Sequence, residues 1–365
     1  MRAGACTLLL TAGLGWLFCA LRVPSGWLIA ALISAGAVAV LRGRQLIPAR
    51  TLLRPAQGCI GLLATEPLAE EAASTTVRYL GIAAVCSGFT LVVCLLCTLI
   101  LVRVAKTLTP ATALLSTLAG GASGISTMAP DLPVDHRYVA LSQYLRLVVV
   151  TLTLPVVLAV VGTPPVVPQT AWGGVSVFTS ASAAAVIAGA GYAALKLHWP
   201  APFLLGPMVA GLPIASIASA AQHHLVLGMP PLINTAAYVV IGWQAGGSFT
   251  RGAIRRFLEL MPLTCTFIGM TIGGCVGLAV LLAHWTRLSF SQAYLATTPG
   301  GIYAVLATAA DSRAGPMVVT MQIFRLLVMY LVAVIGTKLL RTPTESTRAA
   351  KKLSPSRTSS RVFAG

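Results

Sequence analysis

The sequence predicts an all-α, polytopic membrane protein made of two homologous halves. Hydrophobic residues make up 57% of its 365 residues and charged residues only 9%, whereas soluble domains usually carry about 25% charge. Apolar segments long enough to cross a bilayer recur along the chain. A glycine-rich block that also carries hydroxyl side chains occurs twice, once in each half. Together these features exclude an ordinary soluble domain and indicate an internal duplication.

The duplicated block runs from Leu115 to Asp131 in the first half and from Leu295 to Asp311 in the second. The aligned positions are Thr117 with Thr297, Gly120-Gly121 with Gly300-Gly301, and Asp131 with Asp311. A Gln-x-x-Arg-Leu motif follows each copy, at Gln143 and Arg146 and again at Gln322 and Arg325. We expect the function to lie in this block, because it is polar in a chain that is otherwise apolar.

The apolar segments are expected to be helices in two matching sets. The first set covers 6–21, a segment that starts behind Pro24, 50–65, 79–102, 109–129 and 138–161. The second covers 175–195, 203–220, 231–250, 260–283, 291–310 and 316–340. Segment 6–21 alone could be a secretory signal peptide, but its counterpart at 175–195 favours a membrane helix. Residues 342–365 are polar and basic and are expected to form a disordered tail.

Basic residues in the loops predict the topology, because they favour the cytoplasmic side. The loops 42–54 and 251–256 and the tail after Arg341 are all rich in arginine or lysine. If every apolar segment crosses the membrane, the halves are parallel and 251–256 falls outside. If each glycine block enters and returns on one side, each half crosses about five times and all three basic regions lie inside. The second arrangement, an inverted repeat with both termini in the cytoplasm, satisfies the rule. The parallel arrangement remains an alternative.

The second copy of the block contains residues that break a helix. Pro299 lacks an amide donor and clashes with the preceding turn, and Gly300-Gly301 lets the backbone turn. In the first copy Ala119 replaces the proline, so that break depends on glycines alone. The ends of broken helices carry unpaired amides or carbonyls, which can hold an ion or a small solute near the membrane midplane. The alternative is close helix packing through small residues.

Arg146 and Arg325 lie eight or nine residues into their predicted helices, roughly 12–14 Å from the helix start at 1.5 Å per residue. Charge at that depth is costly and is usually paired or functional. Asp131 and Asp311 are the expected counter-ions. One interpretation is a structural ion pair with a snorkelling arginine. The other is recognition of an anionic solute, or a salt bridge that gates a pathway.

The candidate pathway residues share the block and the motif that follows it. They are Thr117, Gly120, Gly121, Asp131, Gln143, Arg146, Thr297, Thr298, Pro299, Gly300, Gly301, Asp311, Gln322 and Arg325.

No catalytic residue, cofactor or metal site is predicted, and we expect a protein that is not an enzyme. The five histidines contain no pair at the i, i+4 spacing of metal ligands. Cys94-x-x-Cys97 lies in an apolar helix, where we interpret both cysteines as packing residues. Phosphate-binding loops, dinucleotide fingerprints and nucleophile elbows are not found in the sequence.

Four stretches carry a resemblance to a known family. They are Pro-Ala-Pro-Phe-Leu-Leu-Gly-Pro (200–207), Val-Val-Ile-Gly-x-x-x-Gly-x-x-Phe-Thr (239–250), Ala-Thr-Thr-Pro-Gly-Gly (296–301) and Gln-x-x-Arg-Leu-Leu (322–327). They resemble the AbrB-duplication membrane proteins, over about residues 1–341 and most strongly in the second half. In the first half Ala30-Ala31 stand where Gly206-Pro207 stand. The resemblance implies a regulator of gene expression or, under another family label, an ammonia monooxygenase. The histidine pattern gives the second label no support.

The leading hypothesis is a secondary transporter or exporter of a small solute in the cell (inner) membrane. Residues 1–165 and 166–341 are expected to be its two repeats, followed by the tail. The alternatives are a membrane-embedded regulator and, third, a monooxygenase-type enzyme. The expected partners are the lipid bilayer, an unknown small solute or ion, and possible further copies of the chain. Nucleic acid is not expected, because the charge of +17 lies in loops and the tail, as in membrane flanks.

Overall fold

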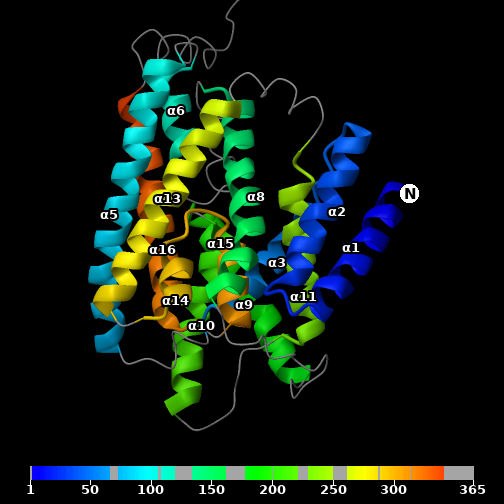
Figure 1. Cartoon of the computed structure of the whole chain (residues 1–365). Helices are drawn as coiled ribbons and strands as arrows, with labels where there is room; N and C mark the ends of the chain where they lie inside the picture. The colour runs from blue at the N-terminus through cyan, green and yellow to red at the C-terminus, as the bar shows by residue number, and fades with distance from the viewer. Residues whose placement is uncertain are drawn as a thin grey trace, which may run out of the picture.

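The computed structural model describes residues 2–65, 73–105, 108–119, 134–161, 177–199, 201–220, 229–249, 261–286, 288–312 and 314–340. Within these ranges the regular secondary structure is α-helix, with no strand. The helices form one bundle, with α5 (Ala73–Val104) and α13 (Met261–Thr286) at one side and α1 (Arg2–Ala20) and α2 (Gly26–Arg42) at the other (Figure 1). The predicted all-α fold is therefore confirmed.

The helices follow the two predicted sets. The first set is α1 (Arg2–Ala20), α2 (Gly26–Arg42), α3 (Arg50–Leu63), α5 (Ala73–Val104), α6 (Pro110–Thr117) and α8 (His136–Val161). The second is α9 (Val177–Lys196), α10 (Pro202–Ala220), α11 (Pro231–Gly246), α13 (Met261–Thr286), α14 (Phe290–Thr297), α15 (Ile302–Asp311) and α16 (Pro316–Leu339). Most bounds lie within a few residues of the predicted ones. The predicted segment 291–310 consists of two short helices, α14 and α15. The expected repeat boundary at 165/166 lies outside the described residues.

Five of the described helices are long and apolar enough to cross a membrane, namely α5, α8, α9, α13 and α16. Shorter apolar helices accompany them, among them α1, α2, α10 and α15. Large apolar side chains on the outside of the bundle are exposed, including Leu9 (74%), Trp16 (73%) and Phe178 (73%). Such an apolar surface suits contact with lipid tails. The chain is thus a polytopic membrane protein; the number of crossings in each half stays a prediction.

The helices on either side of each glycine block begin at the same end of the bundle. In the first half the Asp135 amide, just before α8, donates to Thr112 Oγ1 on α6 at 3.1 Å, so α6 and α8 begin at the same end. In the second half Ala293 of α14, Ala309 of α15 and Met317 of α16 share one buried cluster. The chain therefore goes in along α14, returns along α15 and starts α16 where it entered.

The two blocks enter from opposite ends. The start of α16 packs on α14, while Met329 and Ala333, farther along α16, pack with Leu114 and Leu115 of α6. In Figure 1 α6 descends from the top of the bundle and α14 rises from the bottom. This is the arrangement that distinguishes an inverted from a parallel repeat.

Helices of the two halves pack closely against each other at equivalent glycines. A Cβ on Gly61 of α3 would lie 2.4 Å from the carbonyl oxygen of Leu204 on α10. A Cβ on Gly242 of α11 would lie 2.3 Å from the carbonyl oxygen of Leu28 on α2. Because Gly61 matches Gly242 and Leu28 matches Leu204, each contact is the counterpart of the other with the halves exchanged. Small residues thus allow two pairs of helices to approach at backbone distance.

Backbone strain repeats as well. The described non-glycine residues with positive φ are Arg22 (54°), Ser25 (52°), His198 (55°) and Ala201 (45°). They form two equivalent pairs, in the turns between α1 and α2 and between α9 and α10. A left-handed conformation is unfavourable for such residues, so its occurrence at matching positions reflects one turn structure used twice.

Two basic loops begin at the same end of the bundle. The Leu46 amide, in the turn between α2 and α3, donates to the Gly247 carbonyl oxygen at 2.9 Å. Gly247 directly precedes the loop that contains 251–256, which lies outside the described residues. The contact agrees with the antiparallel arrangement, in which 42–54 and 251–256 share one side. Which side is cytoplasmic stays a prediction.

Candidate functional site

The two short half-helices α6 and α14 begin and end at equivalent residues. Each is eight residues long and starts with a hydroxyl cap, Thr109 or Ser289, that accepts a backbone N–H of the first turn. Each ends on an extended residue, Leu118 (φ −56°, ψ 127°) or Thr298 (φ −55°, ψ 130°). A following proline forces Thr298 out of the helical region. Leu118 adopts the same conformation before Ala119, so proline is not required for the break.

The end of α14 is covered by donors from α16. Arg325 donates through one terminal nitrogen to the carbonyl oxygens of Thr297 (3.0 Å) and Thr298 (2.5 Å). Its other terminal nitrogen donates to Gln322 Oε1 at 2.5 Å. Gln322 Nε2 in turn donates to the Leu295 carbonyl oxygen at 2.6 Å.

The end of α6 is covered in the same way by α8. Arg146 donates to the carbonyl oxygens of Thr117 (3.1 Å) and Leu118 (2.8 Å) and to Gln143 Oε1 (2.5 Å). Gln143 Nε2 donates to the Leu115 carbonyl oxygen at 2.5 Å. The Gln-x-x-Arg motif therefore donates hydrogen bonds to the carbonyl end of a half-helix in both halves.

These contacts explain the motif chemically. The last carbonyls of a helix have no partner within the helix, and they form the negative end of its dipole. In a membrane interior, water cannot satisfy them. A guanidinium supplies several donors and a positive charge at that point. Arg146 and Arg325 are only 4% and 5% exposed, so they do not snorkel to the surface.

The expected pairing of Arg325 with Asp311 is wrong. The Asp311 carboxylate lies at the start of α2, where it accepts the Ser25 amide at 3.0 Å and the Ser25 hydroxyl at 3.4 Å. Tyr238 donates to its other oxygen at 3.5 Å. Asp311 ends α15, a full helix length away from the break where Arg325 binds, and carbonyl oxygens rather than a carboxylate satisfy Arg325. Asp131, the expected partner of Arg146, lies outside the described residues, as do Gly120 and Gly121.

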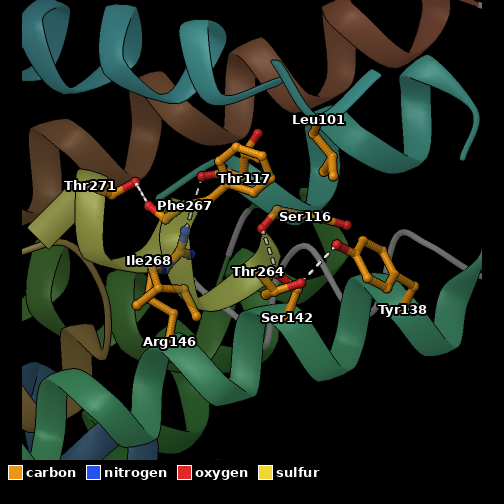
Figure 2. Close-up of a pocket in the computed structure, with 10 residues that line it drawn as sticks. All are labelled: Leu101, Ser116, Thr117, Tyr138, Ser142, Arg146, Thr264, Phe267, Ile268 and Thr271. Atoms are coloured by element: carbon orange, nitrogen blue, oxygen red, sulfur yellow. Dashed lines mark hydrogen bonds between the residues drawn. The ribbon is translucent and has the colours of Figure 1, made fainter. Parts of the chain in front are cut away.

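A small hollow with apolar and polar residues in its lining lies beside the end of α6, in the first half. Its cavity volume is about 10 Å³, roughly the space for one water molecule, and the hollow is partly open to the outside. Figure 2 shows its lining, which comes from α5, α6, α8 and α13. The polar residues that line it are Ser116, Thr117, Tyr138, Ser142, Arg146, Thr264 and Thr271.

Hydrogen bonds tie the walls of this hollow together. The hydroxyls of Tyr138 and Thr264 are 2.9 Å apart, and Ser142 donates to the Ser116 carbonyl oxygen at 3.1 Å. Thr117 Oγ1 lies 2.6 Å from Thr98 Oγ1 on α5. The hydroxyl groups of the lining are therefore hydrogen-bonded within the protein, and they lie beside one guanidinium.

The break of the second half is closed. The backbone turns at Gly300 (φ 131°) and Gly301 (φ 62°), conformations that favour glycine. All residues from Ala293 to Ala309 are buried, including Thr297, Thr298 and Pro299. Gly301 is the N-cap of α15 and gives it no side-chain hydrogen bond. Ser116 to Ala119 at the end of α6 are buried too, although a small hollow borders Ser116 and Thr117.

Sequence reasoning missed several residues of the site. Ser25 and Tyr238 bind Asp311 from other helices, and Thr151 of α8 lies at the second break, where a Cβ on Gly301 would be 3.5 Å from its Oγ1. Ser25 carried a signal, because it follows Pro24 in the turn that precedes α2. Thr151 and Tyr238 carried none, since a hydroxyl in an apolar helix is common.

The described helices and their two arginine-capped breaks define a class of protein: a polytopic membrane protein whose duplicated halves insert half-helices from opposite ends of one bundle. Residues 27–341 match the family model described as "Transition state regulatory protein AbrB", and the chain belongs to this family. The predicted family membership is confirmed.

Two curated relatives extend over nearly the whole chain. One is "Putative regulator AbrB" of Escherichia coli (strain K12), 28% identical over 88% of this chain and 91% of its own length. The other is "Uncharacterized protein YhjN" of Bacillus subtilis (strain 168), 24% identical over 86% of this chain and 87% of its own length.

Proposed function

We propose that this protein is a secondary transporter or exporter of a small solute. The observation that carries the proposal is the pair of half-helices that meet inside the bundle from opposite ends, each with its carbonyl end covered by a buried arginine. In many transporters, broken helices of inverted repeats form the substrate site near the midplane. A small, partly open hollow beside the end of α6, lined in part by hydroxyl groups, is where we propose that the pathway begins.

The difference between the two breaks supports the same proposal. Alternating access requires one side of the site to be open while the other is closed. Here a small hollow borders Thr117 and Arg146, which are only 6% and 4% exposed, whereas Thr298 to Gly301 are buried and are not among the residues that line this hollow. Because the halves are equivalent in their caps, an exchange of these two environments would place a hollow beside the end of α14 and close the one beside the end of α6.

Flux through reconstituted protein tests the proposal. Proteoliposomes are exposed to gradients of amino acids, monocarboxylates, dicarboxylates, inorganic anions and sugars, and currents and internal concentrations are measured. We expect saturable flux of at least one class. In Thr117→Val, which removes a hydroxyl from the hollow, that flux should fall by about two- to tenfold, as expected for loss of one hydrogen bond.

The matched control is Thr153→Val, because the Thr153 hydroxyl bonds within α8 to the Val149 carbonyl oxygen at 2.8 Å and is not among the residues that line the hollow. If wild-type liposomes move no solute faster than empty ones, the transport proposal fails. Equal flux in the Thr117→Val and wild-type proteins would remove Thr117 from the pathway.

A second candidate function, a membrane-embedded regulator, is favoured by the name of the Escherichia coli relative, "Putative regulator AbrB". The basic tail over 342–365 would then transmit the signal to a partner. Deletion of 342–365 separates the two candidates. If the protein is a transporter, the variant without the tail should keep its solute flux. If it is a tail-dependent regulator, the variant should lose its effect on expression of the target genes, and both proteins should show only background flux.

The proposal also gives the protein a location and assigns it no catalytic activity. The protein is placed in the cell membrane with both termini in the cytoplasm, and the lipid bilayer is its first partner. A homo-oligomer is compatible with this arrangement, and neither nucleic acid nor a cofactor takes part.

A further inference from the structure

We infer that the break between α14 and α15 binds a small anion, held jointly by the two halves. The donors are Arg146 Nε and the hydroxyl of Thr151 from α8, the hydroxyl of Thr298, and the first amides of α15. This inference gives the proposed transport function a substrate class, and its physiological meaning rests on that function. The equilibrium binding test of the site does not depend on transport.

Buried polar atoms without a partner mark the site. Arg146 Nε, Thr151 Oγ1 and Thr298 Oγ1 are each fully enclosed and make no hydrogen bond to the described protein atoms. The three side chains are only 4%, 1% and 0% exposed. Buried polar groups in native proteins nearly always have a partner. Three such atoms around one backbone break therefore indicate a bound species.

The glycines bring these atoms to one place. A Cβ on Gly300 would lie 3.4 Å from Arg146 Nε, and a Cβ on Gly301 would lie 3.5 Å from Thr151 Oγ1. Thr298 precedes Gly300 by two residues in the same turn. Because neither glycine has a side chain, no Cβ atom lies between α8 and the break, and the donors there can face a bound species.

Helix α15 adds its N-terminus to the same point. Its ten residues start directly after Gly301, and Gly301 provides no side-chain cap. The first amides of a helix have no partner within it, and they form the positive end of its dipole. Helix N-termini of this kind are favourable sites for anions.

The charge of the ligand follows from the carbonyl and charged groups around the break. A cation would need oxygen ligands, but the last carbonyls of α14 already accept hydrogen bonds from Arg325 and Gln322. Neither Arg146 nor Arg325 forms an ion pair within the described part of the chain. Asp311 lies about 13 Å away along α15, at 1.5 Å per residue, and binds Ser25. Although both guanidinium groups donate to carbonyl oxygens, two buried positive charges near a set of donors favour an anion over a cation.

Anion-dependent stability of the purified full-length protein tests the site. Thermal unfolding in lipid nanodiscs is followed against increasing formate, acetate, lactate, succinate, phosphate, sulfate and chloride, as sodium salts at constant ionic strength. At least one anion should raise the midpoint saturably. Its apparent Kd should increase about two- to tenfold in both Thr151→Val and Thr298→Val, as expected for loss of one hydrogen bond. Thr153→Val, on the same helix as Thr151, should behave as the wild type.

Several results would overturn the inference. They are no saturable effect of any anion, an equal effect in all four proteins, or an effect that follows the cation when potassium replaces sodium. A water molecule at the break would give the first of these results. If the anion binds as expected but no flux occurs, the site stands and the transport proposal fails. If a neutral or cationic solute is transported and no anion binds, transport stands and the site fails.

Discussion

The most informative residues are the two arginines, because they are buried charges whose partners are backbone carbonyls. Arg146 and Arg325 occupy equivalent positions, and each donates to the last carbonyls of a half-helix and to the glutamine one turn earlier. Their primary role is therefore to keep two broken helix ends stable in an apolar bundle. Arg146 does more than Arg325, since its Nε also faces Gly300 of the other half.

At this scale we predict that Arg325→Ala destabilises the protein by more than about 3 kcal/mol, because it leaves the Thr297 and Thr298 carbonyls buried without a donor. Thermal unfolding in nanodiscs measures the effect. Arg325→Lys, which keeps the charge but has a single donor group, should fall between Arg325→Ala and the wild type. Arg103→Ala is the control, because Arg103 is exposed in the last turn of α5. If Arg325→Ala is as stable as Arg103→Ala, the capping role is refuted.

At the scale of elements, the helices and the breaks were largely predictable. Apolar length and matching segments placed most helices, and the Thr-Thr-Pro-Gly-Gly sequence placed the break after α14. The partners of the polar residues were not predictable. A sequence does not show that the carbonyls of Thr117 and Thr297 point toward an arginine, or that Asp311 meets Ser25 across 286 positions. The Asp311 prediction failed because it paired charges by proximity in sequence and overlooked the start of α2.

Contacts between elements give a second prediction, which uses the symmetry of the fold. Gly61→Ala and Gly242→Ala should each destabilise the protein by about 1–3 kcal/mol, because either new Cβ would lie under 3 Å from a backbone oxygen of the other half. Gly277→Ala is the control, since its Cβ would meet nothing within 4 Å on α13, and alanine is the better helix former. Unfolding midpoints should fall by similar amounts in the first two variants and stay level or rise in the third. Opposite effects of Gly61→Ala and Gly242→Ala would contradict the equivalence of the two contacts.

The whole molecule consists of two halves with equivalent elements in inverted orientation. Caps, glycine contacts and strained turns all occur twice, and the two half-helices α6 and α14 enter from opposite ends of the bundle. Inverted halves place equivalent polar breaks on the two approaches to one interior, whereas parallel halves would place both on the same approach. The function proposed above depends on this property more than on any single residue.

Labelling from the two sides of the membrane tests this organisation directly. Thr109 and Ser289 are exposed and start α6 and α14, so Thr109→Cys and Ser289→Cys report where each half-helix enters. In a cysteine-free background, a membrane-impermeant thiol reagent added outside intact cells should modify one variant, and should modify the other only after the cells are opened. The positive-inside rule further predicts that Ser289→Cys is the externally labelled one, because α6 begins at the end where Arg42 and the loop after Gly247 lie. Modification of both variants from the same side would show parallel halves, and a site shared between opposite entrances could not then form.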